Sequence, residues 1–306
     1  MIVALSGGVG GAKLVLGLSR AVGSLPLTTI VNTGDDLELY GLRICPDLDT
    51  VIYTLSGNAN PETGWGVAGD SFHCLDRLGV YGAEAWFRLG DRDLATHLWR
   101  THLLRQGLSL TEIVERICEA LAVRTGVLPM CDDYVPTYVQ TRSGELHLQE
   151  YLVRDRARAQ VRGFRYSNIE DSTLAPGAAE AILKAQMVVM CPSNPFISIG
   201  PMLAVPGMGK ALAATAAPVV AVSPIVGGRA VKGPAGQMLA DLGFPVSAVG
   251  VAALYEGLVD VFVLDRRDES CLVEIEALGM KVVIMDTMMR SLQDKEDLAR
   301  RILEIR

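Results

Sequence analysis

The first part of the chain, up to Val22, constrains the fold more than any other segment. An apolar run, Ile2–Leu5, leads into the glycine-rich segment Ser6–Lys13 (SGGVGGAK), and helical spacing follows over Ala12–Val22. A strand that passes through glycines into a helix is typical of α/β proteins. Glycines let the backbone approach an anion closely, and the start of the helix offers free N–H groups and the positive end of its dipole. The segment therefore predicts a phosphate-binding turn, with a tight turn that holds no ligand as the alternative.

Two familiar glycine motifs do not fit this segment. The dinucleotide fingerprint G-x-G-x-x-G, counted from Gly8, needs its last glycine where Lys13 stands. A Walker loop needs a glycine directly before its lysine, and Ala12 occupies that position. The mismatch disfavours a flavin- or NAD-dependent oxidoreductase. Lys13 is left with two possible roles, as a partner of phosphate or as a solvated helix residue.

Strand-like and helix-like segments alternate along much of the remaining chain. The further strand-like runs are Leu27–Val31, Met187–Met190, Val219–Val222, Val246–Val249, Val259–Leu264 and Lys281–Met285. Short, continuous apolar runs of this kind indicate strands that are buried on both faces of a parallel sheet. We therefore expect an α/β fold with a doubly wound, mostly parallel, Rossmann-like sheet and ligands at the carboxyl ends of its strands.

The middle of the chain has a different order of predicted elements. Its predicted elements are two helices and then a hairpin: Arg92–Arg105, Leu110–Ala122, Val135–Thr141 and Leu146–Val153. A capping box of Ser109 and Glu112 marks the start of the second helix. We expect residues 1–306 to form a single α/β domain, in which about 60–165 are a helical and hairpin insertion that covers the active site.

Composition excludes several classes of protein. Half of the 306 residues are hydrophobic, 21% are charged and the net charge is −7, without a basic stripe, so we expect no binding to nucleic acid. Prolines interrupt the most apolar stretches before they reach the length of a membrane span, and no signal peptide is evident, so we expect a cytoplasmic protein with no membrane partner. The six cysteines never form a C-x-x-C pair, and we expect them to be small buried hydrophobic residues.

Carboxylates follow the second predicted strand and recur shortly afterwards. Asp35 and Asp36 end the segment Asn32-Thr33-Gly34-Asp35-Asp36, and Asp47 and Asp49 lie in Pro46-Asp47-Leu48-Asp49-Thr50. Carboxylate oxygens at the end of a strand are well placed to bind Mg²⁺. Asp47 or Asp49 could instead cap a helix that begins there.

Three later segments carry further polar groups. The segment Cys191–Ser198 offers hydrogen-bonding side chains, and Ser223–Pro234 combines glycines with two cations that suit a diphosphate. Arg88, beside Trp86 and Phe87, could bind a phosphate or a polar ring, or could pair with Asp91 or Asp93 and brace the helix. His97 and His102 are five residues apart, which suits a shared metal poorly, so both are expected to be structural or surface residues.

Taken together, these motifs resemble the 2-phospho-L-lactate transferase family (CofD, called FbiA in some bacteria). The resemblance covers nearly the whole chain. It is carried by Gly7–Lys13, Asn32–Asp36, Pro46–Thr50, Arg88–His97, Pro192–Pro195 and Ser223–Pro234. The family belongs to the biosynthesis of the deazaflavin coenzyme F-420. It joins a phospho-acid unit, carried as a guanosine diphosphate derivative, to the terminal ribityl hydroxyl of the deazaflavin Fo, and GMP leaves.

The resemblance implies roles for particular residues, together with Mg²⁺ as cofactor and a homodimer. Asp35 and Asp49 would bind the metal, Asp49 and Arg88 would orient Fo, and Asp36 is a candidate for polarising the attacking hydroxyl. The guanylylated donor would be held by Gly7, Gly8, Gly10, Gly11, Lys13, Ser193, Asn194, Ser198, Ser223, Gly227, Gly228, Lys232 and Gly233. The donor acid, lactyl, enolpyruvyl or glyceryl, stays open. The alternative is a nucleotide-sugar-binding regulator of related fold without transferase activity.

Overall fold

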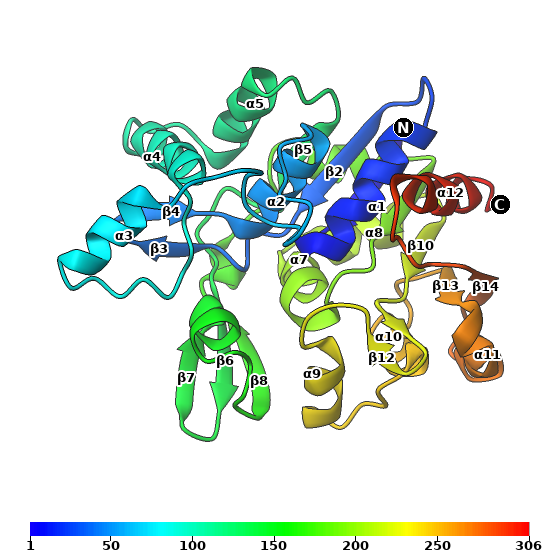
Figure 1. The fold of residues 1–306 in the computed structure, drawn as a ribbon. Helices are drawn as coiled ribbons and strands as arrows, with labels where there is room; N and C mark the ends of the chain where they lie inside the picture. Colours follow the sequence, from blue (N-terminus) through cyan, green and yellow to red (C-terminus); the bar gives the residue numbers. More distant parts are fainter. Residues whose placement is uncertain (306) are drawn as a thin grey trace.

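Seven short apolar segments form one parallel sheet at the centre of the molecule (Figure 1). The computed structural model describes residues 1–305. From one edge to the other, the strands are β14 (Lys281–Met285), β13 (Val261–Asp265), β10 (Val219–Val222), β9 (Met187–Met190), β1 (Ile2–Ser6), β2 (Leu27–Val31) and β5 (Gly126–Pro129). Every neighbouring pair is parallel. This confirms the α/β fold class.

The two faces of the sheet bury two separate hydrophobic cores. Along β1, Ile2 and Ala4 point into one core, and Val3 and Leu5 point into the other, as the alternation of side chains along a strand requires. The first core is covered by α1 (Gly8–Ala21), α2 (Pro46–Leu55), α5 (Leu110–Ala120) and α12 (Leu292–Leu303). The second is covered by α6 (Ala178–Leu183), α7 (Gly200–Ala204), α8 (Met208–Ala214), α9 (Ala235–Asp241), α10 (Ala248–Ala253) and α11 (Leu272–Glu276).

The chain reverses its direction across the sheet between β1 and β9. From β1 the chain continues to β2 and β5 on one side, whereas β9 is followed by β10, β13 and β14 on the other. The carboxyl ends of β1 and β9 are therefore adjacent, and the loops that follow them lead to opposite faces. Such a switch point opens a crevice where α/β proteins bind ligands.

Several smaller elements lie beside the central sheet. The β3–β4 hairpin and helices α3 and α4 lie apart from the three-stranded antiparallel sheet β7–β6–β8 (Figure 1). Their bounds are β3 (Leu37–Leu39), β4 (Leu42–Ile44), α3 (His73–Val80), α4 (Asp91–Arg105), β6 (Thr137–Thr141), β7 (Gly144–His147) and β8 (Val161–Tyr166). The remaining elements are the β11–β12 hairpin (Ile225–Val226 and Arg229–Ala230), π-helical turns at Glu150–Arg154 and Pro195–Ile199, and 3₁₀ turns at Ile169–Asp171 and Arg266–Cys271.

Three expectations are corrected by the structure. The run Val246–Val249 is not a strand, because Ser247 caps α10 by accepting a hydrogen bond from Gly250 N. The second strand of the predicted hairpin ends at His147, and the π-helical turn takes up the rest of Leu146–Val153. Strand β5 pairs with β2 inside the range 60–165, so the segment expected to be one insertion contains a strand of the central sheet.

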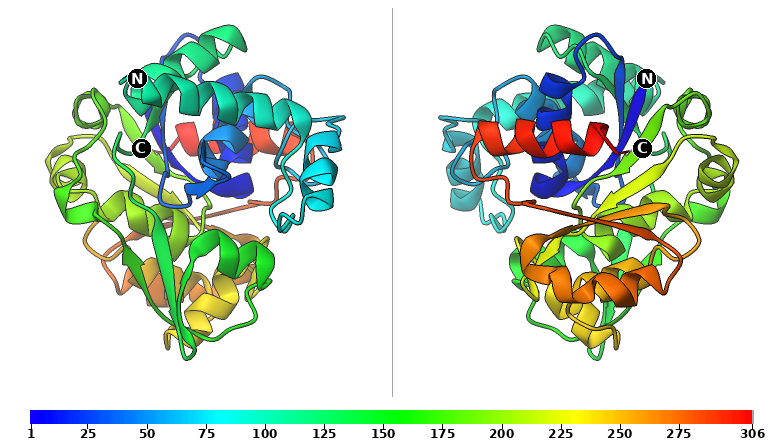
Figure 2. Two further views of the ribbon diagram at one scale, coloured as in Figure 1. Left: turned by 90° about the vertical axis from the view of Figure 1, so that its left-hand side faces the viewer. Right: turned by 90° about the vertical axis from the view of Figure 1, so that its right-hand side faces the viewer.

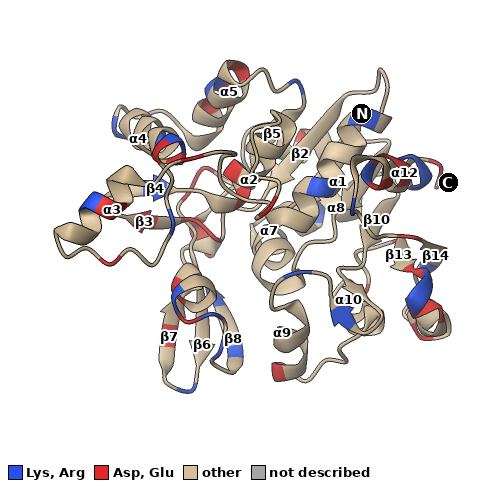
Figure 3. Ribbon diagram, in the orientation of Figure 1, with Lys and Arg blue, Asp and Glu red and all other residues tan. Residues whose placement is uncertain are grey.

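Charges of both signs are spread over the elements, as Figure 3 shows for one view. Within residues 1–305, no single helix is both long enough and apolar enough to cross a membrane. The segments Pro195–Ala204 and Met208–Ala214 reach that length and composition only as a pair, and they are bent by 83°.

Helix α12 packs closely against α1, and the two lie side by side in Figure 2. A Cβ atom added at Gly17 of α1 would lie 2.2 Å from Lys295 O of α12, so only glycine allows this contact. We expect Gly17→Ala to lower the free energy of unfolding by about 1–3 kcal/mol, because backbone must shift. Urea unfolding followed by circular dichroism measures the change.

The matched control is Gly209→Ala in α8, where no atom lies within 4 Å of the added Cβ. This variant should be more stable than the wild type by about 0.5–1 kcal/mol, since alanine favours helix over glycine. Equal stability of the two variants would contradict the close contact of α1 with α12.

Candidate functional site

A cavity of about 410 Å³ opens at the switch point of the sheet. Its walls come from the loops that follow β1, β2, β9, β10 and β14, together with the segment after β7. The wall residues include Gly7, Gly8, Gly10, Lys13, Asp35, Asp47, Leu148, Leu152, Pro192, Ser193, Asn194, Ser198, Ser223, Lys232, Gly233, Met288 and Arg290. Residues from widely separated parts of the sequence thus meet at the carboxyl ends of parallel strands.

The glycines of the β1–α1 turn let two loops touch. Ser193 Oγ accepts a hydrogen bond from Gly7 N at 3.1 Å and donates one to Gly7 O at 2.7 Å. A Cβ atom at Gly10 would lie 2.6 Å from Pro192 O, and one at Gly11 would lie 2.6 Å from Ser193 Oγ. The glycine pattern therefore serves the packing of the turn against the loop after β9, which keeps the backbone of both loops at the cavity.

Two buried carboxylates, Asp35 and Asp47, form the acidic end of the cavity. Burial raises the pKa of Asp35 well above its usual range, and the charges of Asp47 and Asp36 raise it further. Burial also raises the pKa of Asp47 to about 6, against the effect of hydrogen bonds from Asn32 and the backbone of Gly8. The salt bridges of residues 1–305 include none to Asp35 or Asp47. Two neighbouring carboxylates without a cationic partner favour the binding of a divalent cation.

Cationic side chains line other parts of the same cavity. Lys13, Lys232 and Arg290 belong to its wall. Burial lowers the pKa of Lys232, and the positive charge of Lys13 lowers it further. Two lysines that repel one another at a cavity wall favour an anionic ligand. The cavity therefore combines groups for an anion with groups for a cation, as a metal-bound diphosphate requires.

Ten of the thirteen residues predicted to bind the donor line this cavity: Gly7, Gly8, Gly10, Lys13, Ser193, Asn194, Ser198, Ser223, Lys232 and Gly233. Gly11 lies behind the wall, where it packs on Ser193. Gly227 and Gly228 form the turn of the β11–β12 hairpin. Their N–H groups donate to the carboxylate of Asp268 at 2.8 and 3.3 Å, so an internal side chain takes the place predicted for a phosphate.

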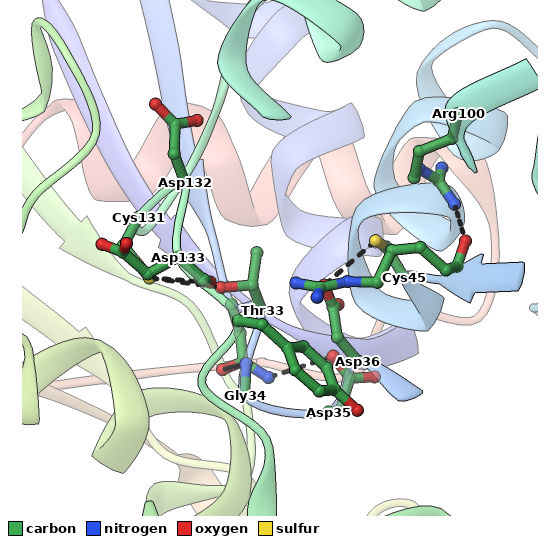
Figure 4. A network of polar contacts seen from close by, with 12 residues as sticks. Thr33, Gly34, Asp35, Asp36, Cys45, Arg100, Cys131, Asp132 and Asp133 are labelled. Carbon is green, nitrogen blue, oxygen red and sulfur yellow. Dashed lines mark hydrogen bonds and ion pairs between the residues drawn. The ribbon is translucent and has the colours of Figure 1, made fainter. Parts of the chain in front are cut away.

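The structure places Asp36 in a buried network rather than at the cavity. Its Oδ2 accepts hydrogen bonds from Arg43 Nε at 2.9 Å and from the thiol of Cys45 at 3.0 Å (Figure 4). Its Oδ1 has no hydrogen-bond partner among residues 1–305. Burial raises the pKa of Asp36, although the charge of Arg43 lowers it. Asp36 is fully buried and lines neither this cavity nor the smaller one at Arg88, so its predicted contact with an acceptor hydroxyl stays a prediction.

Asp49 belongs to the same buried network as Asp36, because Arg100, its partner, also donates a hydrogen bond to Arg43 O at 3.3 Å. Residues 47 and 49 are two apart in α2, so their side chains diverge by roughly 200° around the helix. Both oxygens of Asp49 accept hydrogen bonds from Arg100, whose side chain is fully buried. Asp47, and not Asp49, lines the cavity together with Asp35. Metal binding by Asp35 and Asp49 stays a prediction.

His97 links Asp49 to Asp93 within this network. Its Nδ1 lies 3.6 Å from Asp49 Oδ2, and its Nε2 lies 3.3 Å from Asp93 Oδ1. Ligand atoms of the three residues lie within 4.8 Å of one another, a spacing that could hold a metal ion. Since Arg100 already neutralises both oxygens of Asp49, the arrangement is explained as a buried ion-pair network. The structural role expected for His97 fits this position, whereas His102 is exposed and stacks on Trp99.

Arg88 lies at a second, smaller cavity of about 220 Å³, lined by Asn60, Thr63, Trp65, Gly66, Val67, Asp70, Phe72, Arg88, Gly90 and Asp93. The guanidinium carbon of Arg88 lies 4.3 Å from the centroid of the Phe72 ring. Asp91, the alternative partner of Arg88, instead accepts hydrogen bonds from Ser71 and from the backbone of His73. The salt bridges of residues 1–305 include none between Arg88 and Asp91 or Asp93, so the alternative in which Arg88 braces α4 through these residues has no ion pair behind it.

The loop that lines the second cavity also touches the first. Lys232 Nζ donates a hydrogen bond to Thr63 O at 2.6 Å, and a Cβ atom at Gly64 would lie 2.6 Å from Val9 Cγ1. Val9 and Lys232 both belong to the wall of the larger cavity. The two cavities are thus neighbours across one loop, which suits a reaction between two bound molecules.

Sequence reasoning missed some of the residues at the acidic end. Asp47 was predicted either to bind a metal or to cap the helix that begins there, and the cap is wrong. The N-cap position of α2 is Cys45, without a side-chain cap, and Asp47 instead accepts a hydrogen bond from the backbone of Gly8. Gln149 was not considered, yet its Nε2 reaches Asp35 O at 3.1 Å. No local pattern marks Gln149, because its partner lies 114 positions earlier in the chain.

The fold and the site define a class, the doubly wound α/β proteins with a ligand cavity at the switch point of a parallel sheet. Comparison with known proteins narrows this class to one family. Residues 2–302 match the family model of 2-phospho-L-lactate transferase CofD, and the chain belongs to this family of transferases.

Relatives that match this chain over nearly their whole length have two different names. The chain is 42% identical to a phosphoenolpyruvate transferase of Streptomyces griseus, over 99% of this chain and 98% of the relative. It is 38% identical to a 2-phospho-L-lactate transferase of Methanosarcina mazei, with 99% of both chains covered. A solved structure of a UPF0052 family protein from Bacillus halodurans superposes with a TM-score of 0.68 at 16% identity, covering 99% of this chain and 98% of that one, and this likeness shows the fold.

Substitution of Arg100 tests whether the buried carboxylate of Asp49 depends on its ion pair with this residue. We expect Arg100→Met to lower the free energy of unfolding by about 3–5 kcal/mol, because Asp49 would be left charged and buried without its partner. Chemical denaturation measures the loss.

Arg154→Met is the matched control, since Arg154 forms exposed ion pairs with Glu150 and Asp155. Its effect should stay within about 1 kcal/mol. If both variants lost equally little free energy of unfolding, Arg100 would not be needed to neutralise Asp49. That result would favour the metal-binding role predicted for Asp49.

Proposed function

We propose that this chain transfers a phospho-acid unit from a guanosine diphosphate-linked donor to the terminal ribityl hydroxyl of the deazaflavin Fo, releasing GMP. The unit is phospholactyl or a close analogue such as phosphoenolpyruvyl, and the reaction belongs to coenzyme F-420 biosynthesis. One observation carries the proposal within the family. A cavity with several cationic side chains and two carboxylates, neither in a salt bridge within residues 1–305, adjoins a second cavity across a single loop.

The larger cavity is the proposed donor site. Backbone of the β1–α1 turn and the side chains of Lys13 and Lys232 would bind the diphosphate, since both lysines line the wall. The hydroxyl group of Ser198 offers a further hydrogen bond along the same wall. Ser223 and Asn194 shape the wall instead, because Ser223 Oγ bonds to the backbone of Ile225 and Asn194 Oδ1 accepts from the backbone of the turn that follows it. The names of the relatives, phosphoenolpyruvate transferase and 2-phospho-L-lactate transferase, support a phospho-acid as the transferred unit.

The residues at the acidic end fit Mg²⁺. Asp35 and Asp47 are buried oxygen donors that are not neutralised by a salt bridge within residues 1–305, and they would hold the ion. This proposal replaces the pair predicted from the sequence, Asp35 with Asp49. When bound, Mg²⁺ neutralises negative charge on the diphosphate during transfer.

The smaller cavity is the proposed acceptor site. Trp65 and Phe72 provide aromatic surface, and the guanidinium of Arg88 can stack on a deazaflavin or hydrogen-bond to it. Asp49 would act on the acceptor indirectly, through His97 and Asp93, because Asp93 belongs to the wall and Asp49 does not.

Transfer itself needs positioning more than covalent help. The ribityl hydroxyl oxygen would attack the phosphorus that carries the acid, the bond from that phosphorus to the oxygen of GMP would break, and the hydroxyl proton would be released. The two cavities hold the reactants on either side of one loop, which favours an in-line arrangement. No covalent phosphoenzyme is required.

Mass spectrometry of reaction mixtures tests the function. Purified protein is incubated with Fo and a mixture of guanylylated phospholactate, phosphoenolpyruvate and phosphoglycerate. The proposal expects one phospho-acid adduct of Fo together with an equal amount of GMP, and the mass of the adduct identifies the acid. Binding of nucleotide without any adduct would favour the regulator of related fold.

The acidic pair is tested by Asp35→Asn and Asp47→Asn. Each change removes one negative oxygen donor, so turnover should fall at least tenfold, about 1.4 kcal/mol of transition-state stabilisation. Asp171→Asn, at an exposed position, is the control and should retain wild-type turnover. Undiminished turnover of both site variants, or of wild-type protein in EDTA, would remove the metal from the mechanism.

The acceptor site is tested by Arg88→Lys. Lysine keeps the charge and loses the planar guanidinium, so the KM for Fo should rise while the KM for the donor moves little. Arg77→Lys, on the exposed face of α3, is the control. Steady-state kinetics with each substrate varied in turn decides the question, and a selective rise in the donor KM would move Arg88 to the donor site.

A further inference from the structure

Gln149 is a buried amide that reaches the acidic end of the donor cavity from a distant part of the chain. It lies two residues after the end of β7 and is 5% exposed. Its Nε2 donates hydrogen bonds to Asp35 O at 3.1 Å and to Asp35 Oδ2 at 3.3 Å. One side chain thus holds both the backbone and the carboxylate of Asp35.

A second amide holds the opposite side of the acidic pair. Asn32 Nδ2 donates to Asp47 Oδ2 at 2.9 Å and lies 3.4 Å from Asp35 Oδ1. Asn32 Nδ2 also donates to Ile197 O at 3.2 Å, so Asp35 Oδ1 shares this amide with two nearer acceptors, whereas the side-chain partner of Asp35 Oδ2 is Gln149. A carboxylate with donors on both oxygens has a fixed orientation, and a fixed orientation is what a cation with strict geometry demands of its ligands.

The backbone around Gln149 belongs to the cavity wall. Leu148 and Leu152, on either side of it in sequence, both line the donor cavity. The same segment is fastened to the loop after β2 at a second point, where His147 Nε2 lies 3.1 Å from Asp36 O. Gln149 therefore connects the apolar wall of the cavity to one of its two carboxylates.

We propose that Gln149 is a positioning residue that holds the Asp35 carboxylate in the orientation required to bind a divalent cation together with Asp47. The inference rests on the proposed function only in taking Asp35 and Asp47 as the cation ligands. Gln149 does not touch the reactants; it acts through Asp35. A contact that served packing alone would affect the stability of the fold and leave the affinity for the cation unchanged.

Binding of Mn²⁺ to the full-length protein tests the inference without any turnover. Free Mn²⁺ is followed by electron paramagnetic resonance, and metal-free thermal melting is recorded in parallel. Gln149→Met keeps the length of the side chain and removes the donor, and it should weaken Mn²⁺ binding about tenfold, which corresponds to about 1.4 kcal/mol. Gln149→Asn keeps the amide but shortens its reach, and it should show a similar loss.

Gln237→Met is the matched control. Gln237 also donates its Nε2 to a carboxylate oxygen, Asp241 Oδ1 at 2.7 Å, but it is exposed on α9. This variant should bind Mn²⁺ as the wild type does. Metal-free melting establishes that each Gln149 variant is folded at the temperature of the Mn²⁺ titration, so that a loss of affinity is not a loss of fold.

Two outcomes would overturn the inference, and they have different consequences for the proposed metal site. If Asp35→Asn loses Mn²⁺ binding while both Gln149 variants bind like the wild type, Gln149 is not a positioning residue and the metal site stands. If wild-type protein binds no Mn²⁺, or Asp35→Asn binds it normally, the assignment of the cation to Asp35 and Asp47 fails, and the inference fails with it.

Discussion

The contact between Ser193 and Gly7 is the interaction on which the site depends. One hydroxyl both accepts from the amide and donates to the carbonyl of the same glycine, and so joins the end of β9 to the end of β1. These are the two strands at which the sheet reverses its direction. Side chains larger than hydrogen at Gly10 and Gly11 would force the loops apart. The cavity wall thus exists because the turn after β1 has no side chains where it meets the loop after β9.

The distribution of buried charge gives this cavity its chemical character. Four aspartates follow β2 or lie in the first turn of α2, and only two of them form salt bridges within residues 1–305. Asp36 is paired with Arg43, and Asp49 is paired with Arg100. Asp35 and Asp47 face the cavity, and the salt bridges of residues 1–305 do not neutralise them. Burying unpaired carboxylates costs free energy, and a bound cation would offset that cost.

Much of the fold was predictable because it depends on local patterns. The predicted bounds are correct for four strands, each a short run rich in apolar and β-branched residues: Leu27–Val31, Met187–Met190, Val219–Val222 and Lys281–Met285. The run Val246–Val249 is equally apolar, but the helix cap at Ser247 decides its conformation. Strand β5 was not predicted, because Gly126–Pro129 is short and becomes a strand by pairing with β2.

The site was harder to predict because its partners are distant in sequence. Helical spacing shows that Asp47 and Asp49 diverge, but only the fold shows which one faces the cavity. Gly227 and Gly228 suit an anion, as the sequence indicated, yet the anion is the carboxylate of Asp268, some forty residues further along. Gln149 has no recognisable motif, because its role comes from the docking of the segment after β7 on the loop after β2.

The most direct test of the account is the position of Mn²⁺ in a crystal of the protein grown with GDP and MnCl₂. Anomalous scattering locates the ion independently of any assumption about its ligands. If Asp35 and Asp47 are the cation ligands, one strong peak lies within coordination distance of both, with the diphosphate of GDP against the β1–α1 turn. A peak among Asp49, Asp93 and His97 instead, with none between Asp35 and Asp47, would contradict this account.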